Sequence, residues 1–151
     1  MSMRFRYKQL TARGPVPSLG GRATRPRPII QVTLIGPLAV LAPRGLLDTS
    51  ADDTVFPESF ANQMGIDLTT APVGQASGPG LATAQIRYAE LDLRVSDGQE
   101  FRHWRAWVGF TSTPLKQPLL GFAGFLQYFT ATFHGDLEEV ELAVNTAYPG
   151  T

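Results

Sequence analysis

Runs of β-branched and apolar residues, closed by turn residues, dominate the first half of the chain and predict strands. Residues 29–36 (IIQVTLIG) are rich in β-branched side chains and end at Gly-Pro, which predicts a strand followed by a turn. Residues 38–48 (LAVLAPRGLLD) predict a second strand with a break at Pro43–Gly45. Strands of this length at this spacing are typical of a mostly β domain.

Apolar and polar residues alternate in the centre of the chain, which predicts a strand. It runs from Gln85 to Val95 and changes phase after Tyr88, which shares one face with Ile86. The segment SDGQ at 96–99 predicts a hairpin turn, and FRHWRAWVGF at 101–110 predicts the returning strand. We therefore expect a largely antiparallel sheet.

Two short helices are expected between the strands. Pro57 is a favourable first helical residue, SFANQM follows it, and Gly65 is placed as the C-terminal stop. A second short helix is expected over 122–128, followed by a strand that ends at the turn around Gly135. ELAVN, at 141–145, predicts a last strand.

Composition narrows the class of protein. The 151 residues suit one domain with a hydrophobic core, and 43% of them are hydrophobic. The chain has zero cysteines, which excludes disulfides and thiolate nucleophiles, and only two histidines, for which we expect structural roles. No run of 18 apolar residues and no signal-peptide pattern is found, so a cytoplasmic protein without a membrane partner is expected.

The segment 1–28 is basic and rich in Pro and Gly. It holds seven basic residues and no acid, whereas 29–151 holds six basic residues and 13 acids, a net charge of −7. No strand or helix period is visible, so we expect an extended or irregular arm with residues 5–7 as a short anchor. Such an arm either packs along its own acidic body, is mobile, or contacts nucleic acid or another anionic surface.

An apolar strand ends in three carboxylates within six residues, in the stretch LLDTSADDTVFP at 46–57. A solvated turn, a cation site and a catalytic loop are the candidates. Calcium loops need oxygen ligands at alternating positions with a glycine and a distal glutamate, whereas Ala51 interrupts the series here and no glycine follows. Because core residues flank the acids closely, we expect a partly buried carboxylate, which is costly unless the group is used.

The same stretch resembles the active-site loop of retropepsin-like aspartic proteases, in which an apolar pair precedes Asp-Thr-Gly or Asp-Thr-Ser and then Ala. The second hallmark of that family is an apolar run into Gly before a short C-terminal helix, and LLGFAGFLQYF at 119–129 is similar to it. A glycine-rich segment lies between the two motifs, where the family carries its flap. The resemblance covers roughly residues 28–142 and is nearest to the bacterial and cellular single-domain members.

The resemblance implies a mostly β, single-domain retropepsin-like fold, a closed β-barrel or sandwich with one or two short helices. The domain would span 29–145, between the arm at 1–28 and a C-terminal tail at 146–151. Only one Asp-Thr-Ser occurs, whereas the chemistry needs two carboxylates that share one proton across a water. The chain is therefore expected to be one half of a two-fold homodimer.

The implied activity is that of an aspartic-type endopeptidase, a hydrolase that needs no cofactor and no metal and acts on peptide or protein substrates. Asp48 and its symmetry mate would activate the water, Thr49 would hydrogen-bond across the dimer axis, and Ser50 would direct its backbone N–H at the carboxylate. The flap would be the hairpin at 73–83. The implied substrate-binding residues are Ala51, Asp52, Gln75, Ala76, Ser77, Gly78, Leu119 and Leu120.

One departure from the family bears on the acids that follow the Asp-Thr-Ser. Phe122 stands where many retroviral members have Arg, so Asp52 is expected to pair with Arg44 or with an arm arginine, and Asp53 to lie at the surface or at the pocket rim. The alternative to an enzyme is a catalytically inactive retropepsin-like module that binds peptides or dimerises. A nucleic-acid-binding protein that uses the basic arm is a third and weaker interpretation.

Overall fold

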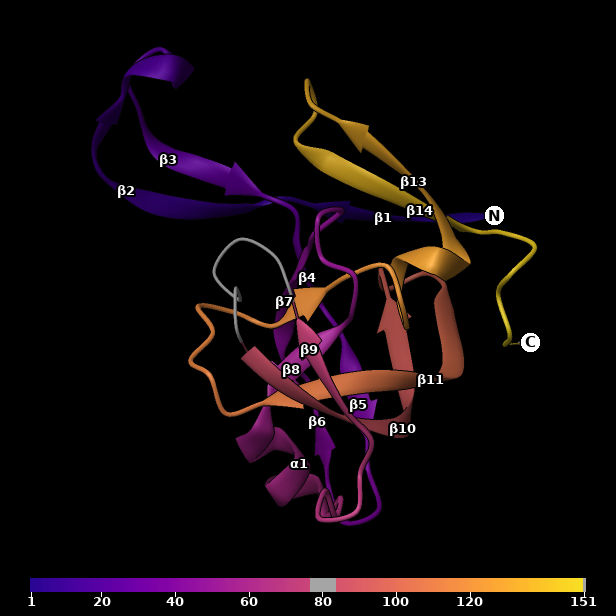
Figure 1. The fold of residues 1–151 in the computed structure, drawn as a ribbon. Coiled ribbons are helices and arrows are strands. Elements are labelled where there is room, and N and C mark those ends of the chain that lie inside the picture. The colour runs from indigo at the N-terminus through magenta and orange to yellow at the C-terminus, as the bar shows by residue number, and fades with distance from the viewer. Residues whose placement is uncertain (77–83, 151) are drawn as a thin grey trace.

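A computed structural model describes residues 1–76 and 84–150, and it is mostly β, as the sequence predicts (Figure 1). The described strands form three sheets, and the described helical elements are one short α-helix, α1 (Glu58–Met64), and two 3-10 turns, η1 (Pro17–Leu19) and η2 (Leu126–Tyr128). The strands are β1 (Ser2–Arg6), β2 (Lys8–Val16), β3 (Arg22–Arg27), β4 (Ile29–Gln31), β5 (Thr33–Ile35), β6 (Val40–Leu41), β7 (Arg44–Leu47), β8 (Val55–Pro57), β9 (Val73–Ala76), β10 (Ala84–Ser96), β11 (Phe101–Thr111), β12 (Leu119–Leu120), β13 (Phe129–His134) and β14 (Glu139–Val144).

The largest sheet curls strongly but does not close. In the described residues its order is β4-β7-β12-β8-β11-β10-β5-β6, with β9 paired to β10. Strands β4 and β5 are successive pieces of one segment that bends at Val32, and this segment connects the first strand of the sheet to the last but one. The predicted closed barrel is wrong, because within the described residues β4 pairs with β7 and β5 with β10 and β6, and no strand pairing joins β4 to β5 or β6. The bend redirects the hydrogen bonds of each half to a different neighbour.

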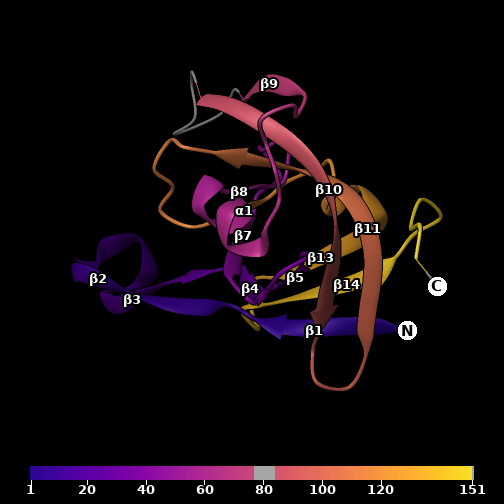
Figure 2. The same ribbon diagram turned by 90° about the horizontal axis from the view of Figure 1, so that it is seen from below.

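Strands β10 and β11 form one long hairpin (Figure 2). The burial of its side chains confirms the predicted alternation of apolar and polar positions and its change of phase. Ile86 is buried near the start of β10, and the buried positions then move to Leu91, Leu93 and Val95. The turn at 96–99 reverses the chain as predicted. On β11 the buried side chains of Trp104, Ala106 and Val108 alternate with exposed neighbours. One face of the hairpin therefore covers the core over most of its length.

An aromatic cluster fills the core beside this hairpin. The Trp104 ring packs edge-on against Phe125, Phe129 and Tyr148 at centroid distances of 5.4–6.1 Å. Its indole N–H donates a 3.0 Å hydrogen bond to the carbonyl oxygen of Gly124. The buried polar group of the indole is thus satisfied, and it ties β11 to the segment that follows β12.

The N-terminal segment is extended, one of the two forms expected for it, and it forms regular strands that contact the body of the protein. β1 pairs with β14, and the buried Met3 belongs to the main core, with Phe5 and Tyr7 packed against it. β2 and β3 form a two-stranded hairpin that extends away from the body (Figure 1). The sequence did not predict these strands, because β1 and β14 lie at opposite ends of the sequence and no local period reports their pairing. The short anchor expected at 5–7 lies within this contact.

The two predicted helices have different outcomes. α1 forms as expected and ends at Gly65, whose left-handed φ of 76° stops the helix. The helix expected over 122–128 is wrong, since only the 3-10 turn η2 forms there. The backbone N–H groups of Phe122 and Ala123 are directed at the acidic loop, and Gly124 has a φ of 90°. Strands β13 and β14 form as predicted.

Candidate active site

The loop 48–54, which connects β7 to β8, lies over the end of β12. β12 inserts between these two strands, parallel to β7 through Leu119↔Leu46 and antiparallel to β8 through Leu119↔Val55. The backbone N–H of Asp48 then donates a 3.1 Å hydrogen bond to the carbonyl oxygen of Leu120. The acidic stretch and the LLG stretch, which are far apart in the sequence, are therefore neighbours in the fold.

The chain that leaves β12 holds the other half of the loop. The N–H of Phe122 donates to the carbonyl oxygen of Ala51 at 2.9 Å, and the N–H of Ala123 donates to that of Asp52 at 2.8 Å. Thr54 returns two hydrogen bonds to the carbonyl oxygen of Ala123, one from its N–H at 3.1 Å and one from its buried hydroxyl at 2.9 Å. Backbone contacts on both sides fix the loop.

Glycine at position 121 is required by this close approach. A Cβ atom there would lie 2.7 Å from the carbonyl oxygen of Ala51 and closer still to that of Asp53. Both obstacles are backbone atoms, which do not move aside as a flexible side chain does. The glycine of the LLG stretch therefore lets the segment after β12 lie directly against the acidic loop.

The carboxylate of Asp48 is oriented by its own loop. Its Oδ1 accepts the backbone N–H of Ser50 at 2.9 Å and the Ser50 hydroxyl at 2.6 Å. Asp48 is half-buried, whereas Thr49 and Ser50 are exposed. Within the described residues no hydrogen bond reaches Oδ2. The loop thus presents a fixed carboxylate with one oxygen available, next to an exposed Thr-Ser edge.

The two following acids behave differently from what the sequence suggested. Asp52 is exposed, and the predicted pairing with Arg44 or an arm arginine is absent from the described part of the chain. Asp53, expected at the surface or at the pocket rim, is half-buried, and its Oδ2 accepts the hydroxyl of Tyr88 at 2.8 Å. Burial of Tyr88, the hydrogen bond to Asp53 and the charges of Asp53 and Asp52 raise the pKa of Tyr88 to about 12.

Sequence reasoning missed Tyr88 as a residue of this site. The available signal was its position on the apolar face that it shares with Ile86, where a buried ring needs a partner for its hydroxyl. The ring also contacts β9, since a Cβ atom on Gly74 would lie 2.8 Å from the ring edge. Tyr88 therefore connects the acidic loop to the base of the β9–β10 hairpin.

The predicted flap is only partly within the described residues. β9 pairs antiparallel with the start of β10 through Val73↔Arg87 to Ala76↔Ala84, and the rest of the predicted flap lies outside the described residues. Gln75 is exposed on β9, and Ala76 ends this strand. Ser77 and Gly78, two of the predicted substrate contacts, lie outside the described residues.

The two leucines before Gly121 have different surroundings. Leu120 is fully buried in the main core, which leaves it no surface to offer a substrate in this chain. Leu119 is 9% exposed and belongs to a second, smaller apolar cluster. This cluster joins the acidic loop to the β9–β10 hairpin, and its members are Leu46, Ala51, Val55, Ala84, Ile86, Tyr88, Leu115 and Leu119.

Metal-ligating side chains do not gather at the loop or elsewhere in residues 1–76 and 84–150, where no group of three or more suited to a cation is found. The two histidines lie apart. His103 approaches Asp92 at 4.0 Å, and His134 approaches Glu141 at 3.6 Å. Both pairs lie on strands outside the acidic loop.

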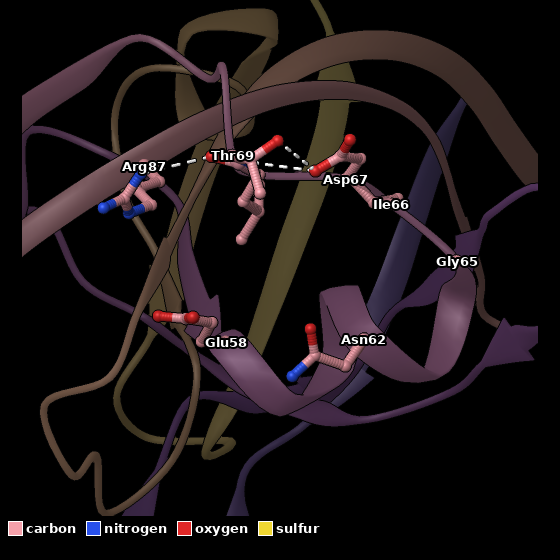
Figure 3. A pocket seen from close by; sticks show the side chains of 8 residues that line it. Glu58, Asn62, Gly65, Ile66, Asp67, Thr69 and Arg87 are labelled. Atoms are coloured by element: carbon pink, nitrogen blue, oxygen red, sulfur yellow. Dashed lines mark hydrogen bonds between the residues drawn. The ribbon is translucent and has the colours of Figure 1, made fainter.

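A separate polar cavity lies beside α1 (Figure 3). It has a volume of about 650 Å³, and Glu58 and Asn62 of the helix face Asp67, Thr69 and Arg87 across it. The pKa of Asp67 is lowered by hydrogen bonds from the backbone and the hydroxyl of Thr69. None of the residues of the loop 48–54 lines this cavity, so it is distinct from the candidate active site.

Comparison with protein-family models and with curated proteins finds no match for this chain. Among the described residues, no helix combines the length and the apolar character needed to cross a bilayer.

Proposed function

We propose that this chain is one half of a homodimeric aspartic endopeptidase. The observation that carries the proposal is the Asp48 carboxylate, which is half-buried, fixed through Oδ1 by Ser50, and placed on a loop held by backbone hydrogen bonds from the segment after β12. Fixed side chains on rigid supports are what general acid–base catalysis requires.

The chemistry follows from a pair of such carboxylates. Two carboxyl groups close together cannot both ionise, so one takes a proton from the attacking water while the other donates a proton to the peptide carbonyl. The sequence supplies one Asp-Thr-Ser per chain, so the second carboxylate would be Asp48 of another copy, related by a two-fold axis. The exposed Thr49 would lie at that axis and brace the two loops against each other.

The surroundings of Asp48 suit an extended peptide. The exposed carboxylate of Asp52 would accept backbone N–H groups of the substrate, and Gln75 on the β9–β10 hairpin would contact the substrate from the other side. The apolar cluster beside the loop adds partly buried side chains, Leu46, Ala51 and Leu115, whose remaining surface is apolar. We therefore expect a preference for apolar side chains next to the cleaved bond.

Cleavage of a diverse peptide library by the wild type and by Asp48→Asn tests the proposal. Asn keeps the shape and the oxygen that accepts the Ser50 hydrogen bonds but cannot take up the proton, so we expect a loss of activity of at least about 10³-fold. Asp136→Asn is the matched control, because Asp136 is an exposed aspartate in the β13–β14 turn. This variant should cleave like the wild type.

Sedimentation of the same samples separates the enzyme from the alternative, an inactive retropepsin-like binding module. A wild-type dimer that cleaves no peptide would favour the module. Activity that survives in Asp48→Asn, or an active monomer, would refute the assignment of Asp48 to a shared dyad. A bell-shaped dependence of cleavage on pH, reporting the pair as a whole, is the expected signature of the enzyme.

A further inference from the structure

The two faces of the β2–β3 hairpin carry different chemistry. One face is anchored to the β13–β14 turn: Arg22 pairs with Glu138 at 2.5 Å, and Gln9 donates to the same carboxylate at 2.7 Å. Strand register places Lys8 directly opposite Arg27, and Leu10 opposite Arg25, so these four side chains share the other face. In the described residues the one ion pair of the hairpin, Arg22–Glu138, thus lies on one face, whereas the cations of the other face form no ion pair.

Two of these cations, Arg25 and Arg27, line a cavity. It has a volume of about 550 Å³ and lies between the hairpin and the loop that joins β11 to β12. Arg13, Arg25 and Arg27 of the hairpin line it, together with Lys116 of that loop. Arg13 lies in the stretch between Thr11 and Val16 where the strand register shifts.

Nothing in the described chain neutralises this group. All four cations are exposed, no described acid forms an ion pair with any of them, and the remaining residues, 77–83 and 151, contain no acidic side chain. Like charges directly opposite each other in a β-ladder are destabilising, as with Lys8 and Arg27. The hairpin therefore carries an unfavourable charge arrangement that an anion would relieve.

The geometry points to this cavity as a binding site for a compact ligand with clustered phosphate groups. Three guanidinium groups supply planar forks that bind phosphate oxygens in pairs, and an ammonium faces them from the neighbouring loop. A single carboxylate would leave most of this charge unmatched. A long nucleic acid fits less well, because residues 29–151 carry a net charge of −7 and the cations converge rather than form a stripe.

Two sources share this chemistry, a soluble oligophosphate and the headgroup of an inositol phospholipid. Titration calorimetry with sodium tripolyphosphate tests the first. Co-sedimentation with phosphatidylcholine vesicles, with and without phosphatidylinositol bisphosphate, tests the second. Binding in either of these two assays, weakened by added salt, supports the site. The assay that shows the binding identifies the source of the phosphate groups.

The variant Arg25→Gln/Arg27→Gln should weaken this binding by about tenfold or more, since it removes two charge-assisted contacts. Lys116 belongs to the loop between β11 and β12, and Lys116→Gln should weaken the binding several-fold. This variant still tests the site if the double variant disturbs the folding of the hairpin. Arg94→Gln is the matched control, because Arg94 is an exposed arginine of β10 stacked on Phe101 and does not line the cavity. It should bind like the wild type.

The unliganded protein gives an independent readout. Arg27→Gln should raise the melting temperature in the absence of ligand, because it relieves the repulsion from Lys8, and tripolyphosphate should raise the wild-type melting temperature. Four results would overturn the site. They are no binding in either assay, binding by the double variant equal to that of the wild type, weakening in Arg94→Gln equal to that in the double variant, and binding of an oligoglutamate or a DNA oligonucleotide as tight as that of tripolyphosphate.

Discussion

The hydroxyl of Tyr88 donates a 2.8 Å hydrogen bond to Oδ2 of Asp53, and this contact ties strand β10 to the loop that carries Asp48. The ring lies in the small apolar cluster, against Gly74 of β9. One side chain thus joins three elements around the candidate active site. Any movement of the β9–β10 hairpin relative to the loop must either carry this hydrogen bond along or break it.

Tyr88→Phe should destabilise the protein by about 1 kcal/mol, because the half-buried Asp53 carboxylate loses its partner. The pKa of Tyr88 is raised from 10.0 to about 12, so its stabilising contribution is complete below pH 10 and is lost as the pH rises through 12. Ultraviolet titration of the tyrosines should therefore show a component near pH 12 in the wild type that is missing in the variant. If the component that the variant lacks titrates near pH 10, the contact is contradicted.

Gly121→Ala should destabilise the protein by about 3 kcal/mol, since the new methyl group would collide with the backbone carbonyls of Ala51 and Asp53. The loop 48–54 would have to move away from the segment after β12, so cleavage should also fall. Gly135→Ala is the control, because a Cβ atom there has no neighbour within 4 Å and its φ is not positive. Denaturant unfolding of the two variants makes the comparison, and equal stabilities would refute the packing argument.

Thr54→Val keeps the shape of a fully buried side chain but removes the hydroxyl that donates to the carbonyl oxygen of Ala123. We expect a loss of about 1–2 kcal/mol in the free energy of unfolding, because the loop loses one of the hydrogen bonds that close it. Thr132→Val makes the same change at an exposed position on β13 and should lie within about 0.5 kcal/mol of the wild type. A neutral Thr54→Val would show that this hydroxyl does not hold the loop.

Glu138 anchors the β2–β3 hairpin, and its pKa is lowered from 4.5 to about 2 by Arg22 and Gln9. A lowered pKa in the folded state means that the stabilisation is complete above pH 4.5 and disappears as the pH falls through 2. The melting temperature of the wild type should therefore exceed that of Glu138→Gln at neutral pH and converge with it in acid. A difference that persists unchanged to pH 2 would contradict this anchoring.

The sequence predicted most securely those elements whose signals are local. The β10–β11 hairpin follows from alternation and a turn at 96–99. The helix α1 follows from Pro57, which precedes its first residue Glu58 instead of being that residue, and from the stop at Gly65. The acidic loop and the LLG stretch were both identified as chemically unusual, and the structure places them against each other. The activity inferred from them stays a prediction.

The failures share one cause. The helix expected over 122–128 was lost because Phe122 and Ala123 hydrogen-bond to the loop 48–54, which is distant in the sequence. The N-terminal strand was missed because its partner, β14, lies at the other end of the chain. Local propensity carries no information about either partner.

The sequence by itself determined the mostly β class, the long hairpin, the helix α1 and the position of the unusual carboxylates, because side-chain periodicity and turn residues act within a few positions of the chain. Only the tertiary structure decided that the large sheet stays open, that Tyr88 holds Asp53, and that the cations of the β2–β3 hairpin divide into a paired and an unpaired face. These features depend on which distant backbone and side-chain groups meet, and their free energy is gained only when the whole chain is folded.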